Sequence, residues 1–451
     1  MYKRQEQELQ RGLKNRHVQL ISIGGAIGTG LFLGSGKSIQ LAGPSILLAY
    51  LITGCICFFI MRALGELLLS NTNNHSFLDF VAEYLGKKAA FITGWTYWFC
   101  WVSIAMADLT AIGMYVRYWA PGVPQWLPEL IALGLLLCLN MVAVSLFGEL
   151  EFWFALIKVV AIIAFILVGA YMILTHYTTD IGTASITNLW SHGGFFPTGA
   201  KGFILAFQMV TFAFAGIELV GLVAGETENP EKVLPEAINN IPIRIILFYL
   251  GSLFVIMAIY PWNSLNPDNS PFVEVFSEIG ITIAASLINL VVLSAAASAC
   301  NSAIYSTGRM LRSLAQEGSA PKKFKKLTTH HVPGNALTFS TIVIFISVIL
   351  NYVMPSEVFT LVSSIATTCF LFIWSMLVYT HMKYRKSILG KKAHSFKMPL
   401  YPFSNYLVFL YMAFVCVVLF LGKDTRIALL LTPVWFLLLL LIYHMKYERK
   451  K

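Results

Sequence analysis

The most informative property of this chain is a series of apolar runs, each close to the roughly 20 residues that a helix needs to cross the hydrocarbon core of a bilayer. Strands that span lipid must close into a barrel and alternate in polarity, and these runs do not alternate. We therefore expect an all-α integral membrane protein with twelve transmembrane helices. The predicted spans lie near residues 18–38, 44–69, 89–117, 127–147, 153–175, 201–223, 243–261, 279–304, 337–354, 357–380, 404–421 and 428–444.

Charged residues are scarce and unevenly distributed. They make up 12% of the 451 residues, whereas hydrophobic residues make up 57%, and the charged share is about half of that in soluble domains. The net charge of +10 suggests a nucleic-acid binder only until its distribution is considered, because Lys and Arg cluster between the apolar runs. This composition argues against a soluble enzyme, a disordered chain and a nucleic-acid-binding protein.

The clusters of Lys and Arg predict the orientation in the membrane. If the N-terminus lies inside, the inner segments hold 25 of the 32 Lys and Arg residues and the outer segments hold five, while Arg62 and Lys158 fall inside spans. Positive charge accumulates on the cytoplasmic side of membrane proteins. We therefore expect a multi-pass protein of the cell (inner) membrane with both termini in the cytoplasm. The lipid bilayer surrounds it, and we expect no nucleic acid and no obligatory protein partner.

The first span contains an unusual concentration of glycine. Gly24, Gly25, Gly28 and Gly30 fall within seven residues near the middle of the membrane, and each costs about 1 kcal/mol of helix propensity relative to alanine. One explanation is close packing of helices through a small face. We favour the other explanation, an unwound stretch whose bare backbone lines a polar cavity, which is where membrane proteins tolerate non-helical backbone at this depth.

A second interruption is predicted in the sixth span. Residues 210–221 read Val-Thr-Phe-Ala-Phe-Ala-Gly-Ile-Glu-Leu-Val-Gly, with small residues and Gly216 at mid-depth and Glu218 shortly after. This signal is weak alone, but it lies five spans after the first, so successive blocks of five spans enter the membrane from opposite sides. Inverted repeats with broken helices at corresponding positions are typical of secondary transporters, and the breaks mark the binding site.

The backbone at the two interruptions predicts the kind of ligand. A half-helix that begins near Gly28–Gly30 presents unpaired N–H groups and the positive end of its dipole, which suit a carboxylate. A half-helix that ends near Phe212–Ala215 presents unpaired carbonyls and the negative end, which suit an ammonium group. Because neither break contains Lys or Arg, a zwitterionic α-amino acid fits better than a simple anion. Phe212 is either a gate over this ligand or an ordinary core residue.

Two charged side chains within the spans are candidates for coupling transport to an ion. Lys158 lies about two turns into the fifth span and could bind and release a proton, although a lysine at this depth could also reach the interface. Glu218 follows the second break and could carry a proton, gate the site or form a structural hydrogen bond. Six polar residues of the eighth span could hydrogen-bond to Lys158, line the cavity or pack helices: Ser294, Ser298, Asn301, Ser302, Ser306 and Thr307.

The remaining charges within the spans are interpreted as structural. Asp108, deep in the third span, is expected to form an ion pair or a polar contact between helices rather than to act in transport. Arg62 and Glu66 are four residues apart, so we expect an ion pair on one face of the second span. The seven cysteines lie in apolar runs without the spacing of metal ligands, so no metal and no other cofactor is expected.

Several segments carry the motifs of a known family. Gly25-Ala-Ile-Gly-Thr-Gly-Leu-Phe32 resembles the first-helix signature of the amino acid permeases in the amino acid–polyamine–organocation superfamily, and Phe212-Ala-Phe-Ala-Gly-Ile-Glu218 resembles their sixth-helix signature. Tyr305-Ser-Thr-Gly-Arg309 resembles the end of their eighth helix. Within this family, segments 65–70, 93–101 and 147–154 are most similar to those of permeases for D-serine, D-alanine and glycine.

The resemblance implies a fold and a division of the chain. The fold is a LeuT-type 5+5 inverted repeat with broken helices 1 and 6, followed by two extra C-terminal helices. The implied boundaries are a cytoplasmic segment at 1–17, a first repeat at 18–175, a second repeat at 201–380, two further helices at 404–444 and a cytoplasmic tail at 445–451.

The resemblance also implies roles for individual residues. Lys158 matches a fifth-helix lysine of proton-coupled members, and Glu218 matches a sixth-helix glutamate linked to gating. The substrate carboxylate would bind backbone groups of the first break, and the ammonium group would bind carbonyls of the second. The residues concerned are Ala26, Ile27, Gly28, Thr29, Gly30, Phe212, Ala213, Phe214 and Ala215.

Together these observations predict a transporter and not an enzyme. We expect proton-coupled import of small neutral amino acids, such as glycine, D-alanine and D-serine, by alternating access, with the proton as the coupling ion. A sodium-coupled carrier or an exchanger with another substrate preference remains an alternative. A non-transporting amino acid sensor is a further alternative, although such sensors usually carry an added signalling domain.

Overall fold

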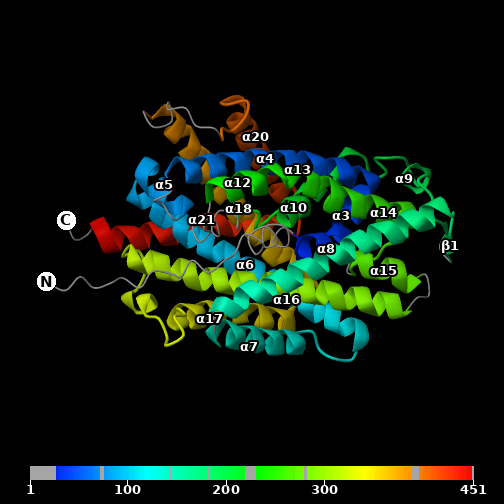
Figure 1. The fold of residues 1–451 in the computed structure, drawn as a ribbon, viewed down its shortest axis with the longest axis horizontal. Helices are drawn as coiled ribbons and strands as arrows, with labels where there is room; N and C mark the ends of the chain where they lie inside the picture. The colour runs from blue at the N-terminus through cyan, green and yellow to red at the C-terminus, as the bar shows by residue number, and fades with distance from the viewer. Residues whose placement is uncertain are drawn as a thin grey trace.

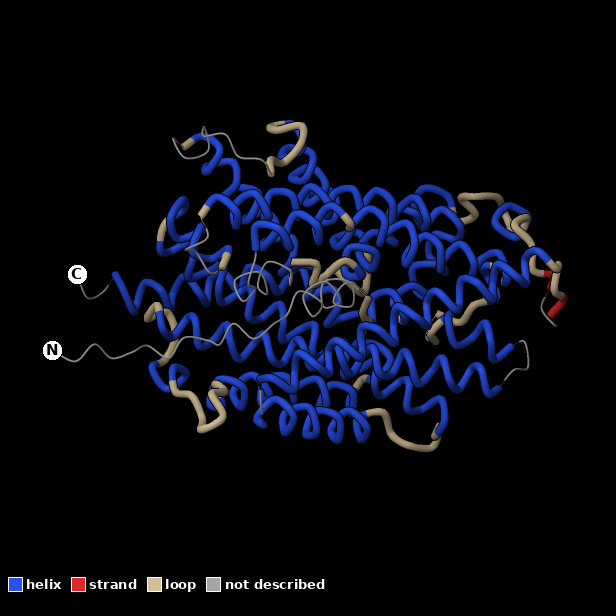
Figure 2. Tube along the Cα trace, in the orientation of Figure 1, coloured by secondary structure: helices blue, strands red, loops and turns tan. Residues whose placement is uncertain are grey.

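The structure is a computed structural model that describes residues 27–71, 76–142, 144–179, 182–218, 230–267, 269–278, 282–387 and 396–448. Within these ranges the chain is almost entirely helical (Figure 1), in agreement with the expected all-α class. A chain in lipid must satisfy its backbone hydrogen bonds within each segment, and helices do so. A pair of two-residue antiparallel strands, β1 (Thr178–Thr179) and β2 (Gly182–Thr183), lies in a loop at one end (Figure 2).

The helices form an elongated bundle (Figure 1). The longer ones are α4 (Ile46–Ser70), α6 (Lys87–Trp119), α7 (Trp126–Val142), α8 (Val144–Leu174), α10 (Gly199–Ala213), α16 (Thr282–Gln316), α17 (Gly334–Val353), α18 (Pro355–Lys386), α20 (Phe403–Leu421) and α21 (Arg426–Tyr443). The shorter ones are α2 (Thr29–Phe32), α3 (Gly34–Ala42), α5 (Phe77–Leu85), α9 (Asn188–Ser191), α12 (Pro230–Asn239), α13 (Ile241–Arg244), α14 (Ser252–Ile259) and α15 (Pro271–Glu278).

The length and surface of these helices are those of a multi-pass membrane protein. Among the described residues, nine helical stretches are long and apolar enough to cross a bilayer, and α7 and α10 are shorter apolar helices. Large apolar side chains also cover the exterior, since Leu167, Leu174 and Ile283 expose 65%, 81% and 84% of their surface. Such an apolar exterior is stable against lipid and not against water.

Helix α6 forms the buried centre of the bundle. It packs against both α16 and α18, and small residues such as Ala105, Ala107 and Ala111, all fully buried, allow these helices to approach. Helix α10 packs against both α2 and α3. This contact brings the start of α2 beside the end of α10, two points more than 180 residues apart in the sequence.

The predicted ion pair between Arg62 and Glu66 is wrong. Glu66 instead pairs with Arg385 of α18, whose Nε lies 2.6 Å from Glu66 Oε1, and Glu66 Oε2 accepts a hydrogen bond from the backbone N–H of Met398 at 2.7 Å. Glu66 is only 1% exposed. A carboxylate buried to this degree requires several donors, and a single flexible arginine on its own helix does not supply them.

A histidine completes this buried network. His381, at the edge of the predicted tenth span, is fully buried, and its Nε2 lies 3.0 Å from Glu66 Oε2. Its Nδ1 lies 3.1 Å from the Asn405 amide nitrogen of α20. Arg62 contacts other partners: it donates to Asn239 Oδ1 at 2.9 Å and stacks over the Phe396 ring. The network therefore ties α4, α18 and α20 together at one end of the bundle.

Replacing Arg385 by alanine should destabilise the protein. The Glu66 carboxylate would stay buried with fewer donors, and breaking a buried ion pair costs about 3–5 kcal/mol. We expect a lower midpoint of thermal unfolding in detergent for Arg385→Ala than for Lys383→Ala, an exposed cation two residues earlier on the same helix. Equal midpoints for the two variants would show that the pair does not hold this end together.

Candidate functional site

A cavity lies in the middle of the bundle, where α2 begins and α10 ends. Six of its lining residues belong to the predicted substrate set: Gly28, Thr29, Gly30, Phe212, Ala213 and Ala215. About 500 Å³ of space at this cavity is free of protein atoms, a volume that includes adjoining solvent. Two further members of the set, Ile27 and Phe214, are buried beside it but do not line it, and Ala26 lies outside the described residues.

The described part of the first predicted break is the start of α2. Gly28 is the N-cap residue, with extended backbone angles (φ −122°, ψ −162°), and no side chain caps the helix. The first intrahelical hydrogen bonds run from the N–H groups of Leu31 and Phe32 to the Gly28 carbonyl, at 3.1 and 3.2 Å. The N–H groups before Leu31 have no intrahelical acceptor, as at any helix start. Gly24 and Gly25 lie outside the described residues.

Gly30 supports both explanations of the glycine-rich run, close helix packing and exposed backbone at a cavity. A β-carbon placed on Gly30 would lie 2.5 Å from the Ala213 Cα and 3.0 Å from its backbone nitrogen. The helix therefore begins beside the cavity and also packs backbone to backbone against α10. Gly28 is different, because the nearest atom to an added β-carbon is the Ala299 Cβ at 3.9 Å.

The second break follows directly on α10. The helix ends at Ala213, residues 214–218 form turns, and Gly216 has a left-handed φ of 91°. Figure 2 shows such non-helical backbone in the middle of the bundle and not only at its ends. A left-handed φ is easy for glycine and strained for other residues. The position of Gly216 therefore explains why the chain can leave the helix here.

The carbonyls of this break are partly occupied. The Phe212 carbonyl accepts from the Ala215 N–H at 2.9 Å, and the Ala213 carbonyl accepts from the Tyr249 hydroxyl at 3.0 Å. The Phe214 carbonyl accepts a longer bond of 3.4 Å from the Ile217 N–H. A carbonyl oxygen has two lone pairs. Each of these groups can therefore accept one more hydrogen bond, but none is a fully free acceptor.

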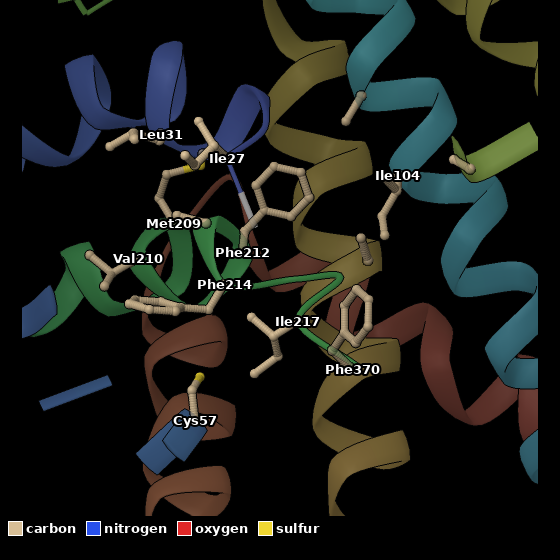
Figure 3. Packing of buried hydrophobic residues seen from close by; sticks show 14 of the residues in the cluster. Ile27, Leu31, Cys57, Ile104, Met209, Val210, Phe212, Phe214, Ile217 and Phe370 are labelled. Carbon is tan, nitrogen blue, oxygen red and sulfur yellow. The ribbon is translucent and has the colours of Figure 1, made fainter. Parts of the chain in front are cut away.

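The two phenylalanines of the break point to different places. Phe212 lies toward Ile27 and toward Ile104 of α6, at the cavity, whereas Phe214 lies on the other side of α10 (Figure 3). The Phe214 ring stacks on the Tyr249 ring at 4.8 Å between centroids. Phe212 is thus the aromatic residue placed over the cavity, and Phe214 is part of the core.

Polar side chains of three other helices complete the lining. Trp101 and Asp108 of α6, Glu151 of α8 and Ser302 of α16 all line the cavity. Each has a buried polar atom without a hydrogen-bond partner, namely Trp101 Nε1, Asp108 Oδ2, Glu151 Oε2 and Ser302 Oγ. Unpaired buried polar groups are costly, and in a cavity they are suited to meet a polar ligand or water.

Asp108 connects the cavity wall to the first break. Its Oδ1 accepts a hydrogen bond of 2.7 Å from the Thr29 hydroxyl, and both residues are almost fully buried. The expected polar contact between helices is therefore present. The same carboxylate also lines the cavity. Asp108 therefore connects the first turn of α2 to the cavity, although the sequence analysis assigned it only a structural role.

Lys158 does not reach the membrane interface. Its side chain is fully buried and donates a 3.0 Å hydrogen bond to the Ser298 hydroxyl of α16. Ser298 in turn donates to Glu151 Oε1 at 2.8 Å. Lys158 is not itself part of the cavity lining. The lysine is therefore joined to the cavity by a two-bond chain through Ser298 and Glu151.

Glu218 is placed away from the cavity. It is 1% exposed, and its carboxylate lies beside the Tyr97 hydroxyl and the Trp374 indole without a well-formed hydrogen bond to either. Its other described neighbours include the thiols of Cys57 and Cys100, which cannot form an ion pair with the carboxylate. The carboxylate therefore lies in a second buried polar cluster behind the second break.

The polar residues of the eighth predicted span have three different roles. Ser298 contacts Lys158, and Ser302 lines the cavity. Asn301 accepts a 2.7 Å hydrogen bond from the Asn140 amide and so joins α16 to α7. The other hydroxyls donate to carbonyls of their own helix: Ser294, Ser306 and Thr307.

Comparison with known proteins settles the family. The model of the amino acid permease family matches residues 17–451. The chain belongs to the amino acid permease family. This permease is 66% identical to the uncharacterized transporter YdgF of Bacillus subtilis, over 98% of this chain and 96% of that protein. It is 65% identical to the amino-acid permease AapA of the same organism, over 99% and 96%.

A relative named for its substrates also matches along its length. The D-serine/D-alanine/glycine transporter of Escherichia coli K12 is 51% identical over 96% of this chain and 93% of that protein. The family and these relatives are transporters or permeases, so this permease is a membrane transporter of amino acids and not an enzyme.

Sequence analysis missed Glu151 and Trp101 as site residues of the permease, although a spacing signal was present. Glu151 precedes Lys158 by seven residues, and Trp101 precedes Asp108 by seven residues. Seven residues are about two helical turns, so each pair shares one face of its helix. A search for polar and aromatic partners two turns from a buried charge would have identified both.

Gly30→Ala should disrupt the site. The added methyl group would overlap the backbone of Ala213, and overpacking of this kind costs about 1–3 kcal/mol. We expect less folded protein and loss of amino acid uptake. Gly28→Ala, which meets its nearest neighbour at 3.9 Å, should fold like the wild type by size-exclusion chromatography. A Gly30→Ala permease with normal folding and uptake would contradict the close approach of α2 to α10.

Proposed function

We propose that this permease imports small neutral amino acids, of the glycine, D-alanine and D-serine type, together with protons. The observation that carries the proposal is the meeting of two opposite helix ends at one cavity: the start of α2 beside the end of α10. Helix starts favour anions and helix ends favour cations. A zwitterion laid across the cavity would have its carboxylate near Gly28–Gly30 and its ammonium group near the carbonyls of Phe212–Ala215.

The side chains of the cavity support this orientation. Asp108 and Glu151 line it, and their negative charge favours the ammonium end of a substrate over a second anion. Because the carbonyls of Phe212, Ala213 and Phe214 already accept one hydrogen bond each, these carboxylates would contribute to ammonium binding. The proposed recognition therefore combines backbone groups with side-chain charge, where sequence analysis expected backbone groups alone.

The size of the lining supports a small substrate. Ala213, Ala215 and Ala299 contribute little bulk, and the aromatic rings of Trp101 and Phe212 occupy part of the wall, which limits the space for a substrate side chain. The relative whose name includes D-serine, D-alanine and glycine is 51% identical along nearly its whole length. We propose that Phe212 closes over the bound amino acid on one side.

Proton coupling is proposed from the buried charges. Lys158 is fully buried and connected to the cavity through Ser298 and Glu151. A cation held in this way can gain and lose a proton during the transport cycle. Glu218, behind the second break, would respond to movement of that segment and so act in gating. The proton serves as the coupling ion, and no other cofactor is proposed.

The proposed architecture rests on the positions of the two interruptions and on the distribution of Lys and Arg. We propose twelve transmembrane helices in a LeuT-type 5+5 inverted repeat, with the boundaries given above and both termini in the cytoplasm of a cell (inner) membrane protein. Two interruptions five spans apart and the Lys and Arg distribution support it. Alternating access would then expose the cavity first to the outside and then to the inside.

Substrate and coupling ion can be tested together in proteoliposomes. We expect labelled glycine to accumulate when the outside is acidic, and unlabelled D-alanine and D-serine to compete better than aromatic or charged amino acids. Accumulation that needs a sodium gradient and ignores the pH gradient would indicate a sodium-coupled carrier. Glycine entry only against preloaded amino acid would indicate an exchanger, and binding without any accumulation would indicate a sensor.

Lys158→Gln should uncouple transport from the pH gradient. The variant keeps a hydrogen-bonding side chain but cannot carry a proton, so we expect loss of pH-driven accumulation with substrate binding retained. Binding measured by thermal shift in detergent with glycine separates this effect from misfolding. Full accumulation by Lys158→Gln would remove the lysine from the coupling mechanism.

A further inference from the structure

The buried lysine and the cavity are separated by a specific chain of groups. The Lys158 ammonium donates to Ser298 Oγ at 3.0 Å, and the Ser298 hydroxyl donates to Glu151 Oε1 at 2.8 Å. The three side chains are buried, with exposed fractions of 1% or less. Glu151 lines the cavity, whereas Lys158 and Ser298 do not. The side of this chain that meets the cavity is therefore the carboxylate.

The second carboxylate oxygen of Glu151 is available for a further hydrogen bond at the cavity end of this hydrogen-bond chain. Glu151 Oε2 is buried and has no hydrogen-bond partner among the described residues. Asp108 and Glu151 are the titratable groups among the described lining residues. Asp108 is engaged through Oδ1 by the Thr29 hydroxyl, and no hydrogen bond connects it to Ser298. Through Ser298 the lysine is therefore connected to Glu151, and no described hydrogen bond of Ser298 leads to Asp108.

We propose that Ser298 and Glu151 form the route by which Lys158 exchanges its proton with the cavity, with Glu151 as the group that gives the proton to, and takes it from, water there. This inference rests on the proposed proton-coupled transport. It names the positioning residue Ser298 and the proton-carrying residue Glu151, neither of which the sequence motifs mark as coupling residues.

The transfer balances in two linked steps. As Lys158 discharges, an Nζ–H bond breaks and its proton joins Ser298 Oγ, while the Ser298 O–H bond breaks and its proton joins Glu151 Oε1. Lysine is then a neutral amine, serine is unchanged, and Glu151 is a neutral acid. The acid releases its proton to water in the cavity and becomes a carboxylate again. The reverse steps reload the lysine from the cavity.

The charges around the chain favour one exchangeable proton. Glu151 and Lys158 lie on α8, and Asp108 of α6 interacts electrostatically with Lys158. Asp108 also faces the Tyr115 hydroxyl of α6 and the Cys300 thiol of α16, both uncharged at neutral pH. With two carboxylates, the net charge is one negative when Lys158 is protonated and two negatives when it is neutral, and isolated buried charge is costly. These charges therefore favour reloading of the lysine after each discharge.

The test replaces the serine and keeps both charged groups. Ser298→Ala breaks the chain, Ser298→Thr keeps a hydroxyl, and Ser294→Ala is the matched control, since Ser294 bonds only a carbonyl of its own helix. Two readouts in proteoliposomes separate the steps: glycine accumulation driven by a pH gradient, and glycine counterflow, which needs no net proton movement. The pH dependence of accumulation is measured for each variant, and for Glu151→Gln.

We expect Ser298→Ala to retain counterflow but to lose about a hundredfold in the initial rate of pH-driven uptake, the lower end of the effect of removing a proton-transfer group. Glu151→Gln removes a lining carboxylate as well as the proton carrier, so it should lose pH-driven uptake and also weaken counterflow. Ser298→Thr should restore accumulation and its pH profile. Ser298→Ala with the pH profile and accumulation of the wild type would overturn the route. Equal loss of both readouts would also overturn it, because it would assign the serine a structural role. Failure of the wild type to respond to the pH gradient would refute proton coupling itself.

Discussion

The contact between the α2 start and the α10 end is the constraint from which the site follows. Gly30 lies so close to the backbone of Ala213 that a methyl group would overlap it. This approach places the open N–H groups of one helix and the carbonyls of the other at a single cavity. Gly216, with its left-handed φ, lets the chain turn away directly afterwards. Gly30 therefore allows the two helices to pack closely, and Gly216 allows the backbone to turn.

Buried charge is the second organising element, and it is arranged in separate groups. One group joins Lys158, Ser298 and Glu151 at the cavity. Another joins Glu66, Arg385 and His381 at one end of the bundle. In the first group an acid and a base of α8 are joined through a serine of α16, and in the second an acid of α4 meets two bases of α18. An unpaired charge at such buried positions would be costly. The first group borders the cavity, which is the basis of the proposed proton exchange, whereas the second is surrounded by its donors and joins helices to each other.

Prediction from sequence worked best where the physical cause is local. Apolar runs of membrane length predict helices, and the glycine-rich stretch and Gly216 predict where helices start and stop, because these depend on neighbouring residues in the chain. Prediction was less successful for the hydrogen-bond and ion-pair partners of buried charged residues. The i,i+4 rule paired Glu66 with Arg62, but Arg385, more than 300 residues away, supplies the donors that a buried carboxylate needs.

The amino-acid sequence by itself determined the helical membrane class, the family and the two short segments at which a zwitterion could be held by backbone groups. Helix propensity, hydropathy and motif spacing carry that information along the chain. Tertiary structure alone decided that Glu151 and Trp101 line the cavity, that Lys158 is fully buried behind Ser298, and that Ala213 presses on Gly30. These facts depend on how α2, α6, α8, α10 and α16 pack, and packing between distant helices is set by the shapes of all their side chains together.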